Sequence, residues 1–475
     1  MAASMKRNAL ANTDENQDIK RSKITSDDKN LESFLSWAAE NGFGLSDKVI
    51  VARESACAQY GMIAIADISD GETLFQIPRK MLLHPGTTDI SDILEKERDK
   101  IQGSSGWAPL LISLMYEYTS EQSPWRPYFN LVPDFTELDL PMFWNKEDRN
   151  SLLKGSGVIE AVEKDLKNIE EEFTTIVLPF IKAHADIFHS QCQELEFYKK
   201  MVTFVMSYSF TEPASMSNDE EDDDGDDNDD EKSGSPTPMM VPMADILNHM
   251  TKNNAHLKFE KEALKMVAIK DIPKGEEVFN TYGEWHQLAP TAQLANWHLL
   301  HMYGFAEPFP SNHWDTVEIS SLVIAQAMEL LSVNTQDMIK KKTSHLADLN
   351  LYGQDVGFIL GVDGVLDEMQ MCDALKVSCM NESQLEKRTQ NEGWESDEEE
   401  EEGTSLCYDN FINLSKEWKA VLKRSAELTL RRYSRSIEED KAMLQSSANS
   451  ARQKYSLYTV NGQKMLLQKL INKCI

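Results

Sequence analysis

The sequence predicts an α+β protein in which a β fold is interrupted by a helical insertion and followed by an all-helical C-terminal domain. Strand-like segments occupy residues 60–78 and return at 256–283. Between them, at about 84–213, apolar side chains recur at helical spacing, and this spacing resumes after the second strand-like region. We therefore expect one domain at 30–310 and a helical one at 311–475.

The first expected elements are one helix and two strands. Leu31–Glu40 (LESFLSWAAE) has apolar residues at helical spacing, and Gly42 follows it closely. Tyr60–Ile68 (YGMIAIADI) and Thr73–Pro78 (TLFQIP) are strand-like, and the SDGE segment at Ser69–Glu72 predicts the turn that joins them.

The same patterns predict helices and strands in the rest of the chain. Helices are predicted at Trp107–Tyr118, Val158–Ala185 and Leu195–Phe210. Strands are predicted at His256–Glu260, Leu264–Ile272 and Glu276–Gly283. C-terminal helical spacing is clearest at Phe411, Leu414, Trp418 and Leu422, and again at Met465–Ile471. The β fold is thus assembled from two distant parts of the chain.

The 475-residue chain has a formal net charge of −31, much of it in two acidic runs. Asp219–Glu231 and Glu395–Glu402 are almost wholly acidic, and we expect them in surface loops at about 216–236 and 392–403. They either attract basic substrates or only increase solubility. The acidic balance excludes a generic nucleic-acid binder, which needs a basic stripe, and favours basic peptides or proteins as partners.

The cysteines favour reduced thiols in a cytosolic or nuclear protein, and a targeting signal favours the nucleus, with the cytoplasm as a second location. Residues 1–29 are polar and expected to be disordered; within them, Lys6-Arg7 and Lys20–Lys23 have the form of a bipartite nuclear import signal. No run of about 18 apolar residues predicts a membrane span, and no hydrophobic signal core is expected. The six cysteines form no CxxC pair, which weakens zinc-site and disulfide interpretations.

Residues suited to chemistry are concentrated in four ordered motifs. These are YGMIAIADISDGETLFQIP from Tyr60, MADILNH ending at His249, EVFNTYG ending at Gly283 and HMYGF ending at Phe305. In this order they resemble the SET-domain protein methyltransferases, and more narrowly the branch with a helical insertion and a Rubisco-methyltransferase-like C-terminal substrate-binding domain. The likeness extends from about residue 31 to the C-terminus, and SGWAPLL, WRPYFNLVPDF and NGQKM support it.

The resemblance implies a protein-lysine N-methyltransferase that uses S-adenosylmethionine (SAM). In-line transfer from the sulfonium requires no metal, but the lysine must be neutral. Burial beside the sulfonium lowers the lysine pKa by desolvation and like-charge repulsion, and alignment supplies further acceleration. The implied substrates are basic segments of nuclear proteins, such as histones and transcription regulators of the NF-kappaB type. No metal, nucleic-acid or membrane partner is expected.

The resemblance also assigns roles to individual residues. Tyr282 matches the catalytic tyrosine, which orients and desolvates the amine rather than acting as a strong base. Asn248 and His249 match cofactor contacts; without the other motifs, a helix cap and a satisfied surface histidine would explain them. The other cofactor positions are Ala58, Gln59, Tyr60, Tyr208 and Tyr303, and the substrate positions are Trp107, Ser209 and Thr211.

Two departures from the family pattern affect this site. The usual Gly-x-Gly turn is replaced by a tripeptide that begins with Gln59 and keeps only its final glycine, so we expect Gln59 in a turn geometry that glycine accepts more easily. Tyr282 and Tyr303 are also farther apart than is usual, because Glu284–Ala292 (EWHQLAPTA) looks inserted between them. An insertion there could crowd the lysine channel.

Two other functions stay open on the sequence alone. The same fold could methylate histidine, because a neutral imidazole also fits a tyrosine-lined pocket. It could instead be a catalytically weak adaptor that binds a protein through its C-terminal domain, which the insertion and the lost glycine favour. Retention of Asn248, His249, Tyr282 and Tyr303 argues against the adaptor, so the lysine methyltransferase is the main prediction.

Overall fold

The computed structural model describes most of the chain as two compact units. The described residues are 28–54, 56–103, 105–131, 138–212, 238–283, 294–331, 335–389 and 405–475. The predicted import signal, both acidic runs and Glu284–Ala292 lie outside them. The first unit is Met1–Glu137 with Asn168–Leu288, and the second is Leu138–Lys167 with Ala289–Ile475.

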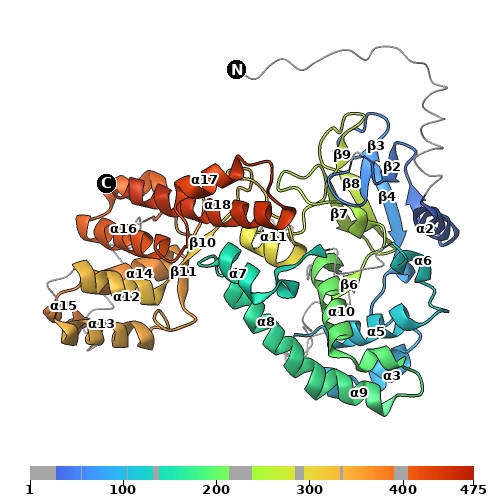
Figure 1. The fold of residues 1–475 in the computed structure, drawn as a ribbon, viewed down its shortest axis with the longest axis horizontal. Helices are drawn as coiled ribbons and strands as arrows, with labels where there is room; N and C mark the ends of the chain where they lie inside the picture. The colour runs from blue at the N-terminus through green and yellow to red at the C-terminus, as the bar shows by residue number, and fades with distance from the viewer. Residues whose placement is uncertain are drawn as a thin grey trace, which may run out of the picture. The chain divides into compact units, whose positions relative to one another are not determined.

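The first unit contains the β fold, built from strands at both ends of its sequence (Figure 1). A four-stranded antiparallel sheet has the order β1-β4-β8-β7, and a three-stranded sheet has the order β2-β3-β9. The strands are β1 (Gly44–Leu45), β2 (Val49–Ala52), β3 (Gly61–Ala64), β4 (Thr73–Pro78), β7 (Ala255–Phe259), β8 (Ala263–Ala268) and β9 (Glu277–Val278). A separate pair joins β5 (Ser209–Thr211) to β6 (Pro238–Met240).

Two predicted strands are shorter than expected because their ends have other partners. The Tyr60–Ile68 segment is a regular strand only within β3, and Ile68 instead forms an isolated bridge with Ile272. The Glu276–Gly283 segment is a strand only at β9, because Asn280 leaves the sheet and forms a parallel bridge with His249. By contrast, Thr73–Pro78 is β4 with the predicted bounds.

Helix α2 (Lys29–Glu40) precedes the first strand, and the other helices of the first unit belong to the insertion. They are α3 (Ser91–Lys96), α4 (Arg98–Ile101), α5 (Ala108–Thr119), α6 (Arg126–Phe129), α9 (Leu178–Ala183) and α10 (Leu195–Tyr208). The predicted Val158–Ala185 helix is in fact three pieces: α8 (Val158–Glu172), a π-helical turn at Phe173–Val177, and α9. Proline lies in the first turn of α9, where its missing N–H is tolerated.

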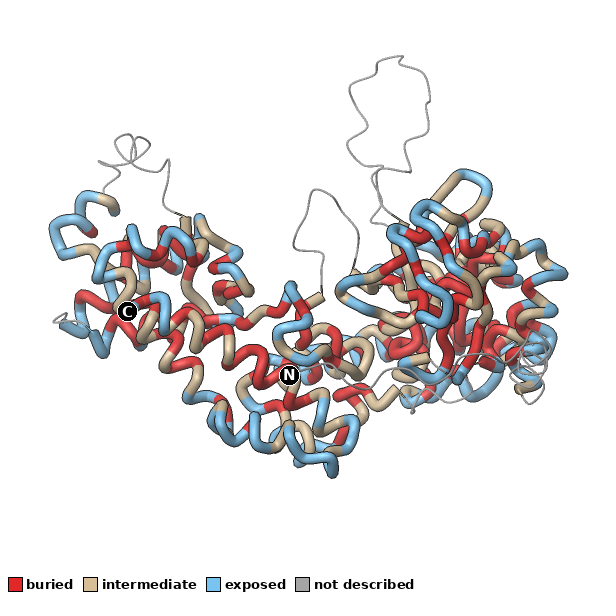
Figure 2. Tube along the Cα trace, turned by 90° about the horizontal axis from the view of Figure 1, so that it is seen from above, coloured by how far each residue is buried: buried red, intermediate tan, exposed pale blue. Residues whose placement is uncertain are grey.

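The second unit is mostly helical, and its hydrophobic core is continuous. Its helices are α7 (Lys146–Leu153), α11 (Asn296–Tyr303), α12 (Ser321–Leu331), α13 (Gln336–Asp348), α14 (Glu368–Cys379), α15 (Glu382–Thr389), α16 (Lys416–Leu430), α17 (Ile437–Leu444) and α18 (Ala451–Lys473). Buried residues fill the interior of each unit (Figure 2). Within the described ranges, no helix is both long and apolar enough to cross a membrane.

The expectation of an all-helical C-terminal domain is wrong in one respect. β10 (Val317–Ser320) and β11 (Gly357–Leu360) form a two-stranded antiparallel sheet. Val317, Ile319, Phe358 and Leu360 are buried and place one face of this pair in the core. Four-residue strands are too short for alternation to be distinguished from the surrounding helical spacing.

A buried ionic cluster joins α17 to α18. Lys464 is 1% exposed and Asp440 0%. The ammonium of Lys464 donates to the Asp440 carboxylate and to the Arg435 carbonyl, and Nε of Arg435 donates to Asp440 Oδ1 at 2.9 Å. Paired and hydrogen-bonded in this way, the charges are tolerated in the core. The cluster gives Lys464 of the NGQKM motif a structural role.

Removing one partner from this cluster leaves buried charge without compensation. We expect Asp440→Ala to lower the free energy of unfolding by about 3–5 kcal/mol, measured by urea denaturation followed by circular dichroism. Glu382→Ala is the control, because it removes an exposed carboxylate 2.8 Å from Lys341 and should cost less than about 1 kcal/mol. Equal losses in the two variants would contradict a structural role for the buried cluster.

Candidate functional site

The site begins at the turn between β2 and β3, where Gly61 lies against other segments. A Cβ atom at Gly61 would lie 2.5 Å from Glu277 Oε1 and 2.7 Å from the Ala56 side chain. No side chain fits in that space unless Glu277 and Ala56 move. The family's second glycine is therefore required here by close approach.

Ala58 and Gln59 are exposed in this turn, whereas Tyr60 is buried. Among the described residues, the non-glycine positions with positive φ are Asp139, Met243 and Asn350. The expectation that Gln59 needs a glycine-like geometry is therefore wrong, because this backbone is accessible to any L-residue. Losing the first glycine imposes no left-handed strain.

Glu277 of β9 connects the turn to the LNH motif. Its Oε2 accepts a hydrogen bond from the Cys57 backbone N–H at 2.8 Å, and its Oε1 accepts one from Asn248 Nδ2 at 2.6 Å. The same Nδ2 donates to the carbonyl oxygen of Tyr60 at 2.9 Å. Three segments that are distant in the sequence thus meet at one buried carboxylate.

The LNH and NTYG motifs run side by side where His249 and Asn280 form their parallel bridge. The N–H of Asn280 donates to the Asn248 carbonyl at 3.0 Å, and the N–H of Met250 donates to the Asn280 carbonyl at 3.1 Å. This pairing places the predicted catalytic Tyr282 beside the predicted cofactor residues.

Two further hydrogen bonds fix Tyr282 at both ends. Its backbone N–H donates to His249 Nδ1 at 3.0 Å, and its hydroxyl donates to the Leu247 carbonyl at 3.1 Å. The centres of the Tyr282 and His249 rings lie 5.1 Å apart. Burial lowers the pKa of His249 to about 4, so the imidazole is neutral and Nδ1 can accept this bond at physiological pH.

The end of α10 approaches the same motif through a chain of aromatic rings. The Tyr208 ring lies 5.4 Å from Phe204, which lies 6.0 Å from Tyr128. The Tyr128 hydroxyl donates to Asp245 Oδ2 at 2.5 Å, and burial raises the pKa of both groups, that of Asp245 to about 7. β5, which carries Ser209 and Thr211, pairs with β6 immediately before the motif.

Two further predicted site residues are Trp107 and Tyr303. Trp107 precedes α5, and its backbone N–H donates to Ser105 Oγ at 3.0 Å; no described hydrogen bond or ring contact connects its side chain to Asn248 or Tyr282. Tyr303 ends α11 in the second unit, where burial raises its pKa.

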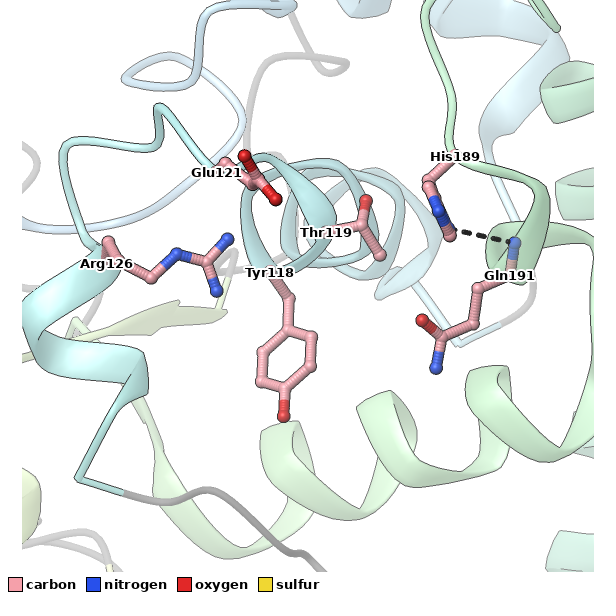
Figure 3. Close-up of a pocket in the computed structure, with 6 residues that line it drawn as sticks. All are labelled: Tyr118, Thr119, Glu121, Arg126, His189 and Gln191. Atoms are coloured by element: carbon pink, nitrogen blue, oxygen red, sulfur yellow. Dashed lines mark hydrogen bonds between the residues drawn. The ribbon is translucent and has the colours of Figure 1, made fainter.

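The first unit also contains a pocket of about 430 Å³ (Figure 3). Its lining residues are Tyr118, Thr119, Glu121, Arg126, His189 and Gln191. The Arg126 guanidinium there donates to the Ser120 carbonyl. None of the predicted site residues lines this pocket. In the described part of the chain, no group of three or more His, Cys, Asp or Glu residues could hold a metal ion.

The contacts of Glu277, Asp245 and Tyr128 were not predicted from the sequence. A glutamate in the segment GEEVF is usually assigned to an exposed strand position, and its partner, the Cys57 N–H, is 220 residues away. Asp245 gave the better signal, because an acidic residue inside the apolar MVPMADIL segment needs a buried partner.

Comparison with known proteins identifies the family. The SET domain model matches residues 59–283, and the Rubisco LSMT substrate-binding model matches residues 334–467. The N-lysine methyltransferase setd6 of Danio rerio is 44% identical over 449 residues, covering 93% of this chain and 94% of its own. The chain belongs to the SETD6 family of SET-domain N-lysine methyltransferases.

Other relatives and solved structures agree with this membership. The N-lysine methyltransferase SETD6 of Homo sapiens is 38% identical, covering 92% of this chain and 94% of its own. A crystal structure of the SET domain of LSMT bound to MeLysine and AdoHcy shares the fold, with a TM-score of 0.63 at 19% identity and coverage of 94% and 91%. The resemblance predicted from the motifs is confirmed, and SETD6 membership favours lysine over histidine as the acceptor.

The close approach at Gly61 leads to a stability prediction. Gly61→Ala forces a methyl group into the space beside Glu277, so we expect a loss of about 3 kcal/mol in the free energy of unfolding. Gly71→Ala is the control, because Gly71 has φ of 84° but no atom lies within 4 Å of the position that a Cβ would take. It should lose only about 1 kcal/mol, from backbone strain. An equal loss in both variants by urea denaturation would refute close approach as the cause.

The buried His249 predicts a pH dependence of stability. Its pKa is lowered from 6.5 to about 4 in the folded chain, so the unfolded chain takes up the proton first as the pH falls. The stabilisation is fully present above pH 6.5 and is lost towards pH 4, by about 2 kcal/mol between pH 7 and 5. Other buried groups also change the stability between these pH values, because burial lowers the pKa of His298 and raises those of Asp245 and Asp315. Urea denaturation at the two pH values should therefore show a loss that is about 2 kcal/mol greater for the natural protein than for His249→Gln. Identical losses would refute the prediction.

Proposed function

We propose that this chain transfers a methyl group from SAM to a lysine side chain, at the site formed by the 57–61 turn, Asn248, His249 and Tyr282. The observation that carries the proposal is the parallel pairing of His249 with Asn280, which places the predicted cofactor and catalytic residues on adjacent backbones. Glu277 then fixes the turn against Asn248.

The residues around Asn248 suit the amino-acid end of SAM. Both described hydrogen bonds of the Asn248 side chain use Nδ2, which leaves Oδ1 to accept from an ammonium group. Ala58 and Gln59 are exposed on the adjacent turn, where backbone N–H groups can meet a carboxylate. When bound, SAM supplies a methyl group activated by the positively charged sulfur.

Tyr282 is suited to orient the acceptor amine. Its hydroxyl proton is directed to the Leu247 carbonyl, so the phenol oxygen can accept a hydrogen bond from an incoming amine. The backbone of Tyr282 is held by neutral His249, which adds no positive charge beside the amine. Burial of the lysine favours its neutral form, and the fixed ring aligns the nitrogen for in-line attack.

The proposed substrates are basic segments of nuclear proteins, including histones and transcription regulators of the NF-kappaB type. The net charge of −31 supports basic partners, because an acidic surface increases their rate of encounter. A nuclear location is proposed on the two basic clusters within residues 6–23.

Two substitutions separate chemistry from cofactor binding. Tyr282→Phe removes the orienting hydroxyl, so we expect kcat to fall about 100-fold while SAM affinity stays within about twofold. Asn248→Ala should weaken SAM binding more than about tenfold, because it removes the proposed ammonium acceptor and the Glu277 contact. Isothermal calorimetry measures the affinity, and transfer of tritiated methyl to a nuclear extract measures the rate.

Tyr116→Phe is the matched control, since Tyr116 on α5 contacts the Phe188 ring and none of the site residues. Tyr116→Phe should keep both the SAM affinity and the methyl-transfer rate of the natural protein. If Tyr282→Phe kept the full rate, the catalytic assignment would be wrong. If the natural protein bound no SAM, the proposed function itself would fail.

A further inference from the structure

A second set of contacts, separate from those of Glu277, holds Tyr60 of the proposed cofactor turn. The Tyr60 hydroxyl donates to Asp28 Oδ2 at 2.7 Å, and Arg53 Nη2 donates to the Tyr60 hydroxyl oxygen at 2.8 Å. Arg53 Nε also donates to Asp28 Oδ2 at 3.0 Å, and the guanidinium lies 4.3 Å from the centre of the Tyr60 ring. Each of these three side chains therefore contacts the other two.

We call Asp28, Arg53 and the Tyr60 side chain the clamp, and Tyr60 connects it to the turn. Its side chain is 8% exposed, and its carbonyl oxygen accepts the hydrogen bond from Asn248 Nδ2. The neighbouring Ala58 and Gln59 are exposed. The turn is thus fixed at Tyr60 through its ring and its backbone, and the exposed pair depends on that anchor for its position.

Asp28 also connects the clamp to α2. Its Oδ1 accepts from the Leu31 N–H at 3.1 Å and so caps the helix. Partial burial acts to raise the pKa of Asp28, but hydrogen bonds from Tyr60 and Leu31 and the charge of Arg53 lower it overall. Asp28 is therefore ionised at neutral pH. One carboxylate serves both α2 and the cofactor turn.

We propose that Asp28 and Arg53 are positioning residues for cofactor binding, which fix the Tyr60 ring and thereby hold the Ala58–Tyr60 backbone in place. This inference rests on the proposed function. It predicts that the clamp changes SAM affinity and leaves the rate at saturating SAM unaltered. It also explains how a turn without the family's first glycine keeps a defined geometry.

The test compares Asp28→Asn, Arg53→Gln and Tyr60→Phe by calorimetric titration with SAM. Asparagine caps helices about as well as aspartate, so α2 is retained in the first variant. Each substitution should weaken SAM binding by about three- to tenfold, the size expected for a partly exposed hydrogen bond to a charged group. The double variant D28N/Y60F should be less than about twofold weaker than either single variant, because both remove the same contact.

Lys48→Gln is the matched control, since it breaks an ion pair of 2.7 Å with Glu72 that does not involve the turn. It should leave SAM affinity within about twofold. The rate at saturating SAM should stay within about twofold in Asp28→Asn, which distinguishes positioning from a catalytic defect.

The outcomes separate this inference from the function on which it rests. If the natural protein bound no SAM, the proposed function would fail. If it bound SAM and the three clamp variants bound as tightly as Lys48→Gln, the positioning role would be wrong while the function stood. A lower melting temperature with unchanged SAM affinity would also overturn the inference, because the clamp would then serve only the stability of α2.

Discussion

The site depends on two hydrogen bonds that the Glu277 carboxylate accepts. This carboxylate lies beneath Gly61 and accepts hydrogen bonds from the Cys57 backbone and from the Asn248 side chain. A buried carboxylate is costly unless donors surround it, and here both donors come from segments that must meet for the site to exist. These two hydrogen bonds therefore offset the free-energy cost of burying the Glu277 carboxylate, and they also hold the turn against the LNH motif. The close approach of the carboxylate also explains why only glycine fits at Gly61.

Neutral His249 connects this part of the site to Tyr282. His249 pairs with Asn280 through the backbone and accepts the Tyr282 N–H with its ring. Burial keeps its pKa well below the physiological range, so the ring serves as an acceptor without adding a charge beside Tyr282. The Tyr282 hydroxyl is aligned by the Leu247 carbonyl from the same segment. The arrangement of the proposed site thus depends on one short parallel pairing of two backbones.

Much of the fold could be predicted from local patterns, because helical spacing and turn residues act over short distances. The helix near Leu31 and β4 at Thr73–Pro78 follow from such patterns. The shortened strand at Glu277–Val278 does not, because it ends where a tertiary partner takes over its hydrogen bonds. The β10–β11 pair was missed because its strands are too short for alternation to be decisive.

The site divides in the same way. Asn248, His249 and Tyr282 were predicted from ordered motifs, and the structure brings them together. Glu277 was missed because its function depends on partners distant in sequence. The strain expected at Gln59 was wrong, because the missing glycine does not correspond to a positive φ at this position. The glycine that is retained, Gly61, is required because neighbouring side chains pack closely against it.

The most direct test of this account is calorimetric titration of SAM into Glu277→Gln. Glutamine keeps the size of the side chain but replaces one acceptor oxygen with a donor, which must then face either the Cys57 N–H or the Asn248 amide. We expect SAM affinity to fall more than about tenfold while the circular dichroism spectrum stays unchanged. Affinity within about twofold of the natural protein would contradict the central role of this carboxylate.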